Sequence, residues 1–305
     1  MTKDPTGTFT LGHSPDPDDA FMFYAIAKNK INLRGYRFEH RLEDIQTLNE
    51  RARRGELDIS AISIHAYPYV ADKYALLSCG ASMGDGYGPV LVRKQQASNL
   101  EHRTSNSSTL QPFNTPVDHE SARELLRDRT IAVPGKLTSA FLALQLFLGD
   151  FKFTVVPFDR IFDAVETGQA DAGLIIHEGQ LTYAQRGFEM VADLGGWWKR
   201  QTGLPLPLGG NVVRKDIPAP VQRDLNEIIC ESIDYGLIHR DEAVAYSLAF
   251  ARDMNQQLAS RFIGMYVNEF TRDYGATGRA AIRRFLADAH EKKYINVPIE
   301  IEFVE

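Results

Sequence analysis

The stretch Ala170–Tyr183, ADAGLIIHEGQLTY, decides the fold that we expect for this chain. Its uncharged residues 172–176 predict a short strand buried on both faces, as found inside parallel sheets. His177 follows this strand directly, and Glu178 comes next. Ligands of open α/β sheets bind beyond the carboxyl ends of the strands, and imidazole can exchange a proton near neutral pH. His177 is therefore either a group that faces a cleft or a core histidine bonded to a backbone carbonyl or to Glu178.

A second unit follows the same plan. Residues 55–65 (GELDISAISIH) and 168–177 (GQADAGLIIH) each begin with glycine, place aspartate three residues later and end an apolar run on histidine. Glycine suits the left-handed position after a helix, and aspartate closes the tight turn into a strand. Two such units predict an α/β fold with two similar lobes.

The composition is that of an ordinary globular protein. Of 305 residues, 44% are hydrophobic and 24% are charged, and the length allows two domains. The net charge of −6 gives no reason to expect nucleic acid or an anionic membrane as a partner. Cys79 and Cys230 lack CxxC spacing, which argues against a disulfide scaffold and fits a reducing compartment.

Other patterns lead us to expect a cytoplasmic protein with no metal and no cofactor. The amino terminus lacks the basic and apolar segments of a signal peptide, and no apolar run approaches the ~20 residues that span a bilayer. The eight histidines are scattered without HxH or HExxH spacing. We expect a monomer or a weak homodimer.

A loop with three aspartates follows the first predicted strand. Asp16 suits the N-cap of a helix, and Asp18 and Asp19 complement the helix dipole. The loop is either simply a well-capped helix start or, with Ser14, a wall of the cleft. Three carboxylates there would repel an anion and favour the hydroxyl groups of a sugar.

The start of another helix carries no acid. Residues 130–135 predict a strand and a turn, and Thr138 or Ser139 would cap the helix that follows. Free backbone N–H groups and hydroxyls at a helix start form an anion site, and Lys136 precedes this one. The position is either an ordinary cap or the contact for the carboxylate of a small-molecule substrate.

Two matching strands divide the chain. Residues 88–94 (GPVLVRK) and 209–215 (GGNVVRK) both leave a glycine-rich loop and end in Arg-Lys, so we interpret them as crossings between the lobes. The polar residues from about 95 to 128 are predicted to form a surface insertion. The predicted boundaries give a discontinuous first lobe of residues 1–92 and 214–305 and a second lobe of residues 93–213.

Four motifs together resemble one known family. They are residues 14–25 (SPDPDDAFMFYA), 134–140 (PGKLTSA), 173–183 (GLIIHEGQLTY) and 194–209 (LGGWWKRQTGLPLPLG). The chain resembles the 1,4-dihydroxy-6-naphthoate synthases of the futalosine route to menaquinone over nearly its whole length. The resemblance implies a type II periplasmic-binding-protein-like fold. Each of its two α/β lobes has a mixed, mostly parallel sheet flanked by helices, and the ligand cleft lies between the lobes.

The resemblance also implies an activity and a set of site residues. The family converts cyclic dehypoxanthinyl futalosine, a benzoate-bearing spiro sugar, to 1,4-dihydroxy-6-naphthoate. Its catalytic base is the histidine of the IIHE motif, here His177, which removes a proton before a carbon–carbon bond breaks. The other implied contacts are Thr138 and Ser139 for the carboxylate, and Ser63, Ile176, Leu206, Leu208, Gly209 and Gly210 for the cleft wall.

The first loop departs from the family pattern SPCPNDT. Asp16, Asp18 and Ala20 replace Cys, Asn and Thr, while Asp19 keeps its counterpart. His65 stands where the family leads us to expect no histidine, and its aromatic neighbours favour a role in packing or in the pocket wall over a catalytic one. These differences fall in the expected cleft, so they bear on the identity of the substrate more than on the fold.

Two other functions stay open. A solute-binding receptor for a small organic anion would use the same fold without chemistry, and the sister enzyme chorismate dehydratase would form an enol on it. The missing signal peptide and His177 argue against the receptor. The IIHE and GLPLPLG motifs argue against the dehydratase, so we expect a cofactor-independent lyase.

Overall fold

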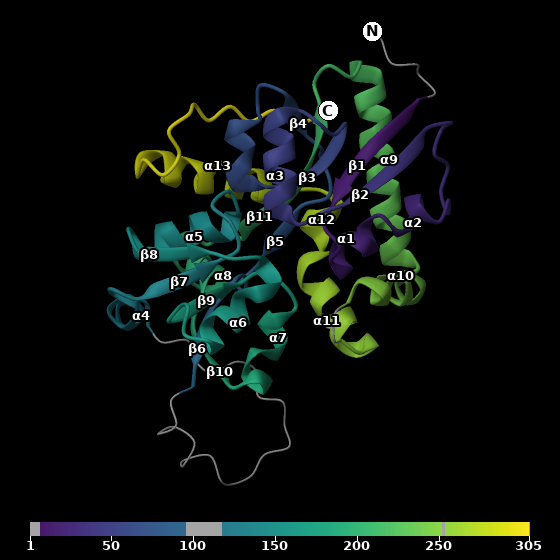
Figure 1. Cartoon of the computed structure of the whole chain (residues 1–305). Coiled ribbons are helices and arrows are strands. Elements are labelled where there is room, and N and C mark those ends of the chain that lie inside the picture. Colours follow the sequence, from purple (N-terminus) through teal and green to yellow (C-terminus); the bar gives the residue numbers. More distant parts are fainter. Residues whose placement is uncertain (1–6, 96–117, 252–253, 305) are drawn as a thin grey trace.

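The computed structural model describes residues 7–95, 118–251 and 254–304, which form two lobes around two sheets (Figure 1). The first sheet has the order β2-β1-β3-β11-β4, with β5 paired to β11, and the second has the order β10-β6-β9-β7-β8. The strands of the first sheet are β1 (Thr8–His13), β2 (Arg37–Leu42), β3 (Ile59–Ser63), β4 (Tyr74–Leu76), β5 (Ser82–Gly84) and β11 (Leu206–Arg214). Those of the second are β6 (Val90–Lys94), β7 (Thr130–Val133), β8 (Lys152–Val155), β9 (Ala172–Ile175) and β10 (Phe188–Asp193).

The helices flank these sheets (Figure 1). The first lobe contains helices from both ends of the chain. They are α1 (Pro17–Met22), α2 (Tyr24–Ala27), α3 (Ile45–Arg54), α9 (Ala219–Ile238), α10 (Arg240–Ser247), α11 (Gln256–Tyr266), α12 (Glu269–Arg272) and α13 (Gly275–Glu291). Those between β6 and β11 are α4 (His119–Leu126), α5 (Ser139–Leu148), α6 (Ile161–Glu166), α7 (Gly179–Thr182) and α8 (Leu194–Thr202).

The two sheets share one topology. In the first, β1 pairs in parallel with β2 and β3, and β11 runs antiparallel between β3 and β4. In the second, β7 pairs in parallel with β8 and β9, and β6 runs antiparallel between β9 and β10. Each lobe therefore has a mixed sheet in which one strand arrives from the other lobe, which confirms the expected α/β fold with two similar lobes.

The repeated glycine–aspartate unit has the same structure in both lobes. Gly55 and Gly168 adopt φ of 69° and 78°, the left-handed conformation that glycine takes without strain. The side chain of Asp58 accepts a hydrogen bond from the backbone N–H of Thr10 at 2.9 Å, and Asp171 accepts one from Thr130 at 2.8 Å. The strands β3 and β9 that follow are buried throughout, as predicted.

The lobe boundaries differ from those predicted. The strands interpreted as crossings are each a full member of the sheet that the chain enters, β6 of the second sheet and β11 of the first. The chain therefore crosses at residues 85–89 and 203–205, before these strands, rather than at 92 and 213.

The predicted surface insertion overlaps the core of the second lobe. Helix α4 belongs to that core, because Ala122 and Leu126 are buried in it, so its residues are not part of a surface insertion. Residues 96–117 of the predicted insertion lie outside the described residues.

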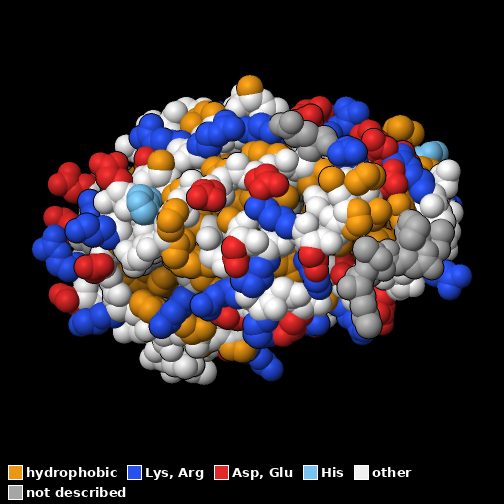
Figure 2. Space-filling view, turned by 90° about the horizontal axis from the view of Figure 1, so that it is seen from above, with side chains coloured by type: hydrophobic (Ala, Val, Ile, Leu, Met, Phe, Trp, Pro, Cys, Tyr) orange, Lys and Arg blue, Asp and Glu red, His pale blue; other side chains and the backbone are white. Residues whose placement is uncertain are grey.

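The surface carries both signs of charge. Figure 2 shows Lys and Arg side chains interspersed with Asp and Glu over one face of the molecule. Within the described ranges, no helix combines the length and the apolar character needed to cross a bilayer.

Candidate active site

A cavity of about 120 Å³ lies between the two lobes. Its wall is formed by the first loop and the β3 end of the first lobe, by the start of α5, and by residues of β11. The expected site residues that line it are Ser14, Asp16, Asp18, Asp19, Ser63, Thr138, Ser139, Ile176, Leu208, Gly209 and Gly210. Three others, Leu206, His65 and His177, do not line it. Residues more than 190 positions apart in sequence thus meet at one cavity.

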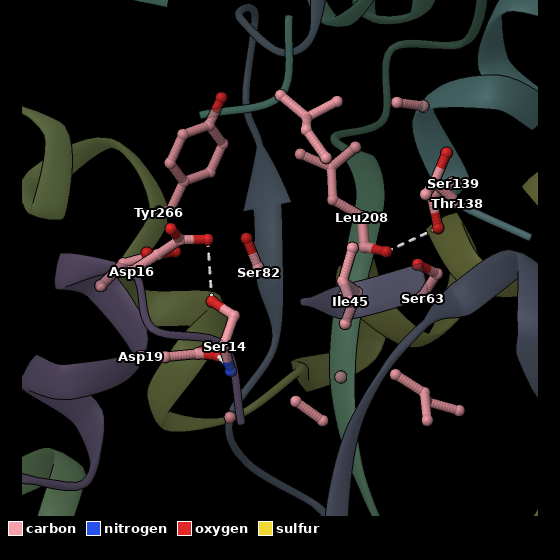
Figure 3. Close-up of a pocket in the computed structure, with 18 of the residues that line it drawn as sticks. Ser14, Asp16, Asp19, Ile45, Ser63, Ser82, Thr138, Ser139, Leu208 and Tyr266 are labelled. Carbon is pink, nitrogen blue, oxygen red and sulfur yellow. Dashed lines mark hydrogen bonds between the residues drawn. The ribbon is translucent and has the colours of Figure 1, made fainter. Parts of the chain in front are cut away.

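The carboxylates of the first loop lie on one side of this cavity (Figure 3). Asp19 accepts a hydrogen bond from the backbone N–H of Ser14 at 2.6 Å, and Asp16 accepts one from the Ser14 hydroxyl at 2.8 Å. Asp16 occupies the N-cap position of α1, as predicted, but its side chain makes no capping hydrogen bond to the helix. The loop is thus held by Ser14 rather than by a capped helix start.

Burial changes the proton affinity of this loop. It raises the pKa of Asp19 to about 7, with the neighbouring Asp16 adding to the effect. Burial and the charges of Asp19 and Asp16 also raise the pKa of Asp18 well above its usual range. A protonated carboxyl can donate as well as accept a hydrogen bond. This side of the cavity can therefore bind a hydroxyl group either as a donor or as an acceptor.

The start of α5 forms the opposite side (Figure 3). Thr138 is its N-cap, and the Thr138 hydroxyl accepts from the backbone N–H of Phe141 at 3.2 Å, as predicted. The Ser139 hydroxyl donates to the carbonyl oxygen of Leu208 at 2.5 Å and accepts from the backbone N–H of His65 at 3.1 Å. The first turn of α5 contains no acidic residue. This helix start is the more electropositive end of the cavity.

Ser63 is fixed beside this helix by a buried asparagine. The side chain of Asn49 donates to the Ser63 hydroxyl at 3.0 Å and accepts from the backbone N–H of Ser63 at 2.8 Å. The same amide donates to the carbonyl oxygen of Leu137 at 3.3 Å. Asn49 therefore ties the end of β3 to the segment that leads into α5.

His65 is a buried packing residue that bridges the lobes. Its side chain is 4% exposed, and its Nδ1 lies 3.2 Å from the carbonyl oxygen of Thr138. Burial lowers the pKa of His65 from 6.5 to about 4, so the ring is neutral at neutral pH. Of the two roles considered for His65, packing agrees with this geometry.

His177 lies on the far side of the cavity wall. Ile176 and Gln180 line the first cavity, whereas His177, Glu178 and Gly179 line a second cavity of about 370 Å³. The turn from 176 to 180 therefore separates the two cavities.

Aromatic residues and a backbone N–H group hold the His177 ring. It lies edge-on to Phe158 and Phe162, with ring centroids 5.8 Å and 6.1 Å away. Its Nδ1 accepts from the backbone N–H of Gly179 at 3.0 Å and lies 3.6 Å from a carboxylate oxygen of Glu178. Its buried Nε2 has no hydrogen-bond partner among the described residues. Because Nδ1 accepts, the neutral ring in this arrangement carries its proton on Nε2.

Several residues of the cavity were not predicted. Gln180, Asn211 and Tyr266 all line it, and each is at most 3% exposed. The side-chain oxygen of Asn211 has no hydrogen-bond partner among the residues that the structure describes. Gln180 lies within the motif of residues 173–183, only three residues after His177. This short separation was the one feature of the sequence that could have indicated Gln180 as a site residue. Tyr266 ends an amphipathic helix whose sequence pattern gives no sign of a site.

The fold and the inter-lobe cavity define a class of two-lobed binding folds. A solved structure from Candida albicans, described as having the generic periplasmic binding protein fold, matches with a TM-score of 0.64 and 13% identity. The match covers 96% of this chain and 98% of that chain. At this identity it shows the fold alone, and it confirms the periplasmic-binding-protein-like architecture.

Closer relatives give the family. The model of a menaquinone biosynthesis family matches residues 9–291. Two proteins named 1,4-dihydroxy-6-naphtoate synthase are similar to the chain: that of Thermus thermophilus is 36% identical over 282 residues, and that of Streptomyces coelicolor is 34% identical over 288. The matches cover 92% of this chain, and 94% and 93% of the respective relatives. A crystal structure of an Archaeoglobus fulgidus protein matches with a TM-score of 0.82 at 41% identity, over 94% of this chain and 98% of that one. The chain belongs to the menaquinone biosynthesis family, and the expected resemblance is confirmed.

Proposed function

We propose that this protein is a 1,4-dihydroxy-6-naphthoate synthase, a cofactor-independent lyase that converts cyclic dehypoxanthinyl futalosine to 1,4-dihydroxy-6-naphthoate in menaquinone biosynthesis. The observation that carries the proposal is the continuous similarity to two proteins of that name, at 36% and 34% identity. The similarity spans both lobes, so it includes the segments that enclose the cavity.

The two ends of the cavity suit the two ends of such a substrate. The benzoate carboxylate is proposed to lie at the start of α5, near Thr138 and Ser139, where no acid opposes it. The hydroxyl groups of the sugar-derived part then lie against Asp16, Asp18 and Asp19 on the other side. Binding in the reverse sense would put an anion against three carboxyl groups.

His177 is the proposed general base. The proton that it removes comes from the sugar-derived part, the electron pair left behind breaks a carbon–carbon bond, and aromatisation of the naphthoate ring drives the reaction. This sequence consumes no external oxidant or reductant. A positioned base typically contributes ~10²–10⁴-fold to the rate.

The ring must turn before it can act in the first cavity. Its Nδ1 is bonded to the Gly179 N–H group, and His177 lines the second cavity rather than the first. A turn that breaks the Gly179 bond would let Glu178, now 3.6 Å away, accept an Nδ1 proton. The lone pair would then be on Nε2, which is the state that a base needs.

Incubation of purified protein with cyclic dehypoxanthinyl futalosine tests the proposal. We expect 1,4-dihydroxy-6-naphthoate, identified by mass. A parallel incubation with chorismate, followed by ultraviolet spectra, tests the sister dehydratase activity. Saturable binding of the futalosine derivative without product would instead support a solute-binding protein.

The proposal places the enzyme in the cytoplasm as a monomer or a weak homodimer, with no nucleic acid or membrane as partner. Cell fractionation tests the location, and light scattering at several concentrations tests the oligomeric state.

A further inference from the structure

One buried hydrogen bond joins the lobes beside the His177 turn. The hydroxyl of Tyr266 donates to the side-chain oxygen of Gln180 at 2.5 Å. Tyr266 ends α11, which packs on α1 and α10 of the first lobe, while Gln180 lies in α7, which follows β9 of the second. Both side chains line the inter-lobe cavity, and they are 3% and 2% exposed.

Gln180 belongs to the same turn as the His177 ring. The backbone N–H of Gln180 donates to the carbonyl oxygen of His177 at 3.0 Å, and that of Gly179 donates to His177 Nδ1, also at 3.0 Å. Residue 179 packs directly on the ring, because a Cβ placed there would lie 2.7 Å from His177 Cε1. A shift of this turn therefore shifts the imidazole with it.

Aromatic packing holds the first-lobe end of the bond. The Tyr266 ring packs edge-on against Phe262 and Tyr87, with centroids 5.3 Å and 6.0 Å away. Burial raises the pKa of Tyr266 well above its usual range, so its hydroxyl keeps its proton and remains a donor. Tyr266 and Asp16 both line the cavity, and Figure 3 shows them on the side opposite Thr138 and Ser139.

We propose that Tyr266 and Gln180 are positioning residues that couple the approach of the two lobes to the placement of His177. When the lobes are together, the hydroxyl from α11 holds Gln180 and so fixes the backbone of the turn from 177 to 180, from which the His177 side chain swings toward the first cavity. When they separate, this bond breaks and the turn loses its anchor to the first lobe. The catalytic part of this inference depends on the proposed role of His177, whereas the placement of the ring does not.

Tyr266→Phe tests the coupling because it removes the hydroxyl and keeps the ring. We expect kcat for naphthoate formation to fall about tenfold, as for the loss of one net hydrogen bond that holds the base in place, with KM changed less than threefold. Tyr74→Phe is the matched control, because Tyr74 is also buried but its hydroxyl bonds within the first lobe, to the Leu57 carbonyl at 2.6 Å. A Tyr266→Phe enzyme with the kcat of Tyr74→Phe would overturn the inference.

The partner residue separates coupling from general damage. Gln180→Leu should lower kcat to a similar extent, and the double variant with Tyr266→Phe should be no slower than the slower single variant. Additive losses would show that the two residues act independently, against the inference.

A measurement on the ring itself needs no turnover. In protein with ¹³C-labelled histidine, the His177 signals are assigned by their loss in His177→Gln. In the native protein we expect the neutral tautomer with the proton on Nε2, and in Tyr266→Phe these signals should shift or broaden while those of Tyr74→Phe stay unchanged. Identical His177 signals in native and Tyr266→Phe protein would overturn the inference. If the shift occurs but no substrate is converted, the placement holds and the proposed function fails.

Discussion

The two lobes are built alike through the strand that precedes the histidine of each repeated unit, and they differ from the end of that strand onward. After β3 the chain enters a 3₁₀ helix, Ile64–Tyr69, and His65 bonds through Nδ1 to the Thr138 carbonyl of the other lobe. After β9 it forms α7, and His177 bonds only to the backbone of its own turn among the described residues. Two residues after the histidine, the first unit has the fully buried Tyr67 and the second has Gly179.

His65 and His177 occupy equivalent backbone positions in the two lobes, but their side chains have different surroundings. Both imidazoles follow a buried strand at the same sheet position, so the shared unit fixes where each backbone lies. The buried His65 ring packs edge-on against Tyr69, with centroids 6.1 Å apart, whereas Gly179 leaves room for the His177 ring beside a second cavity. The lobes therefore supply one structural and one candidate catalytic histidine from the same local fold.

The strongest test of this division exchanges each histidine for glutamine. We expect His177→Gln to lower kcat by ~10²–10⁴-fold, the usual contribution of a general base, with the melting temperature close to native. His65→Gln should instead lower the free energy of unfolding by about 1–2 kcal/mol through lost packing and hydrogen bonding, with kcat within a few-fold of native. Steady-state kinetics and thermal melts of both variants measure this, and a reversal of the two outcomes would exchange the roles.

Gly179, two residues after His177, can be compared by mutation with Gly168, which begins the same repeated unit. A Cβ at 179 would lie 2.6 Å from Phe162 Cε2 and 2.7 Å from His177 Cε1, so Gly179→Ala should displace the ring and lower kcat on the order of 50-fold. Gly168→Ala meets no atom within 4 Å but has φ of 78°, so it should cost only about 1 kcal/mol of stability. Equal activity of the two variants would mean that Gly179 does not hold the ring.

The repeated units were predictable from sequence because their determinants are local. Gly55 and Gly168 are needed at left-handed positions, and Asp58 and Asp171 close turns a few residues on, so a short window contains the whole pattern. The four motifs of the family resemblance also contain residues of the cavity wall, among them Thr138, Ser139 and Ile176, and these were expected there because the resemblance implied them.

The rest depended on contacts between distant segments. The bond from Tyr266 to Gln180 joins residues 86 positions apart, and that from Ser139 to Leu208 joins residues 69 apart. No local pattern specifies either pair. The predicted end of the strand gave the position of the His177 backbone. The direction of its ring depends on packing against Phe162 and Gly179, which cannot be inferred from sequence periodicity.

Because His65 is buried as a neutral ring, lowering the pH should lower the free energy of unfolding. Its pKa is about 4 in the folded protein and about 6.5 when unfolded, so the unfolded chain binds the proton more readily. The stability that the neutral ring contributes is complete above pH 6.5 and is lost as the pH falls toward 4. Between pH 6.5 and 5 this loss should be about 2 kcal/mol. Urea melts across that range should show a shallower pH dependence in His65→Gln, and parallel curves for the two proteins would contradict this assignment.

The smallest expected difference concerns the two aspartates that close the repeated units. Asp58 is 4% exposed and accepts from both the backbone N–H and the hydroxyl of Thr10, each at 2.9 Å. The side chain of Asp171 is 44% exposed, and water can replace it as the partner of the Thr130 N–H group. Asp58→Ala should therefore cost about 1.5 kcal/mol of unfolding free energy and Asp171→Ala about 0.5 kcal/mol. Equal costs in urea melts would show that burial does not distinguish the two turns, and that these turns are alike in energy as well as in geometry.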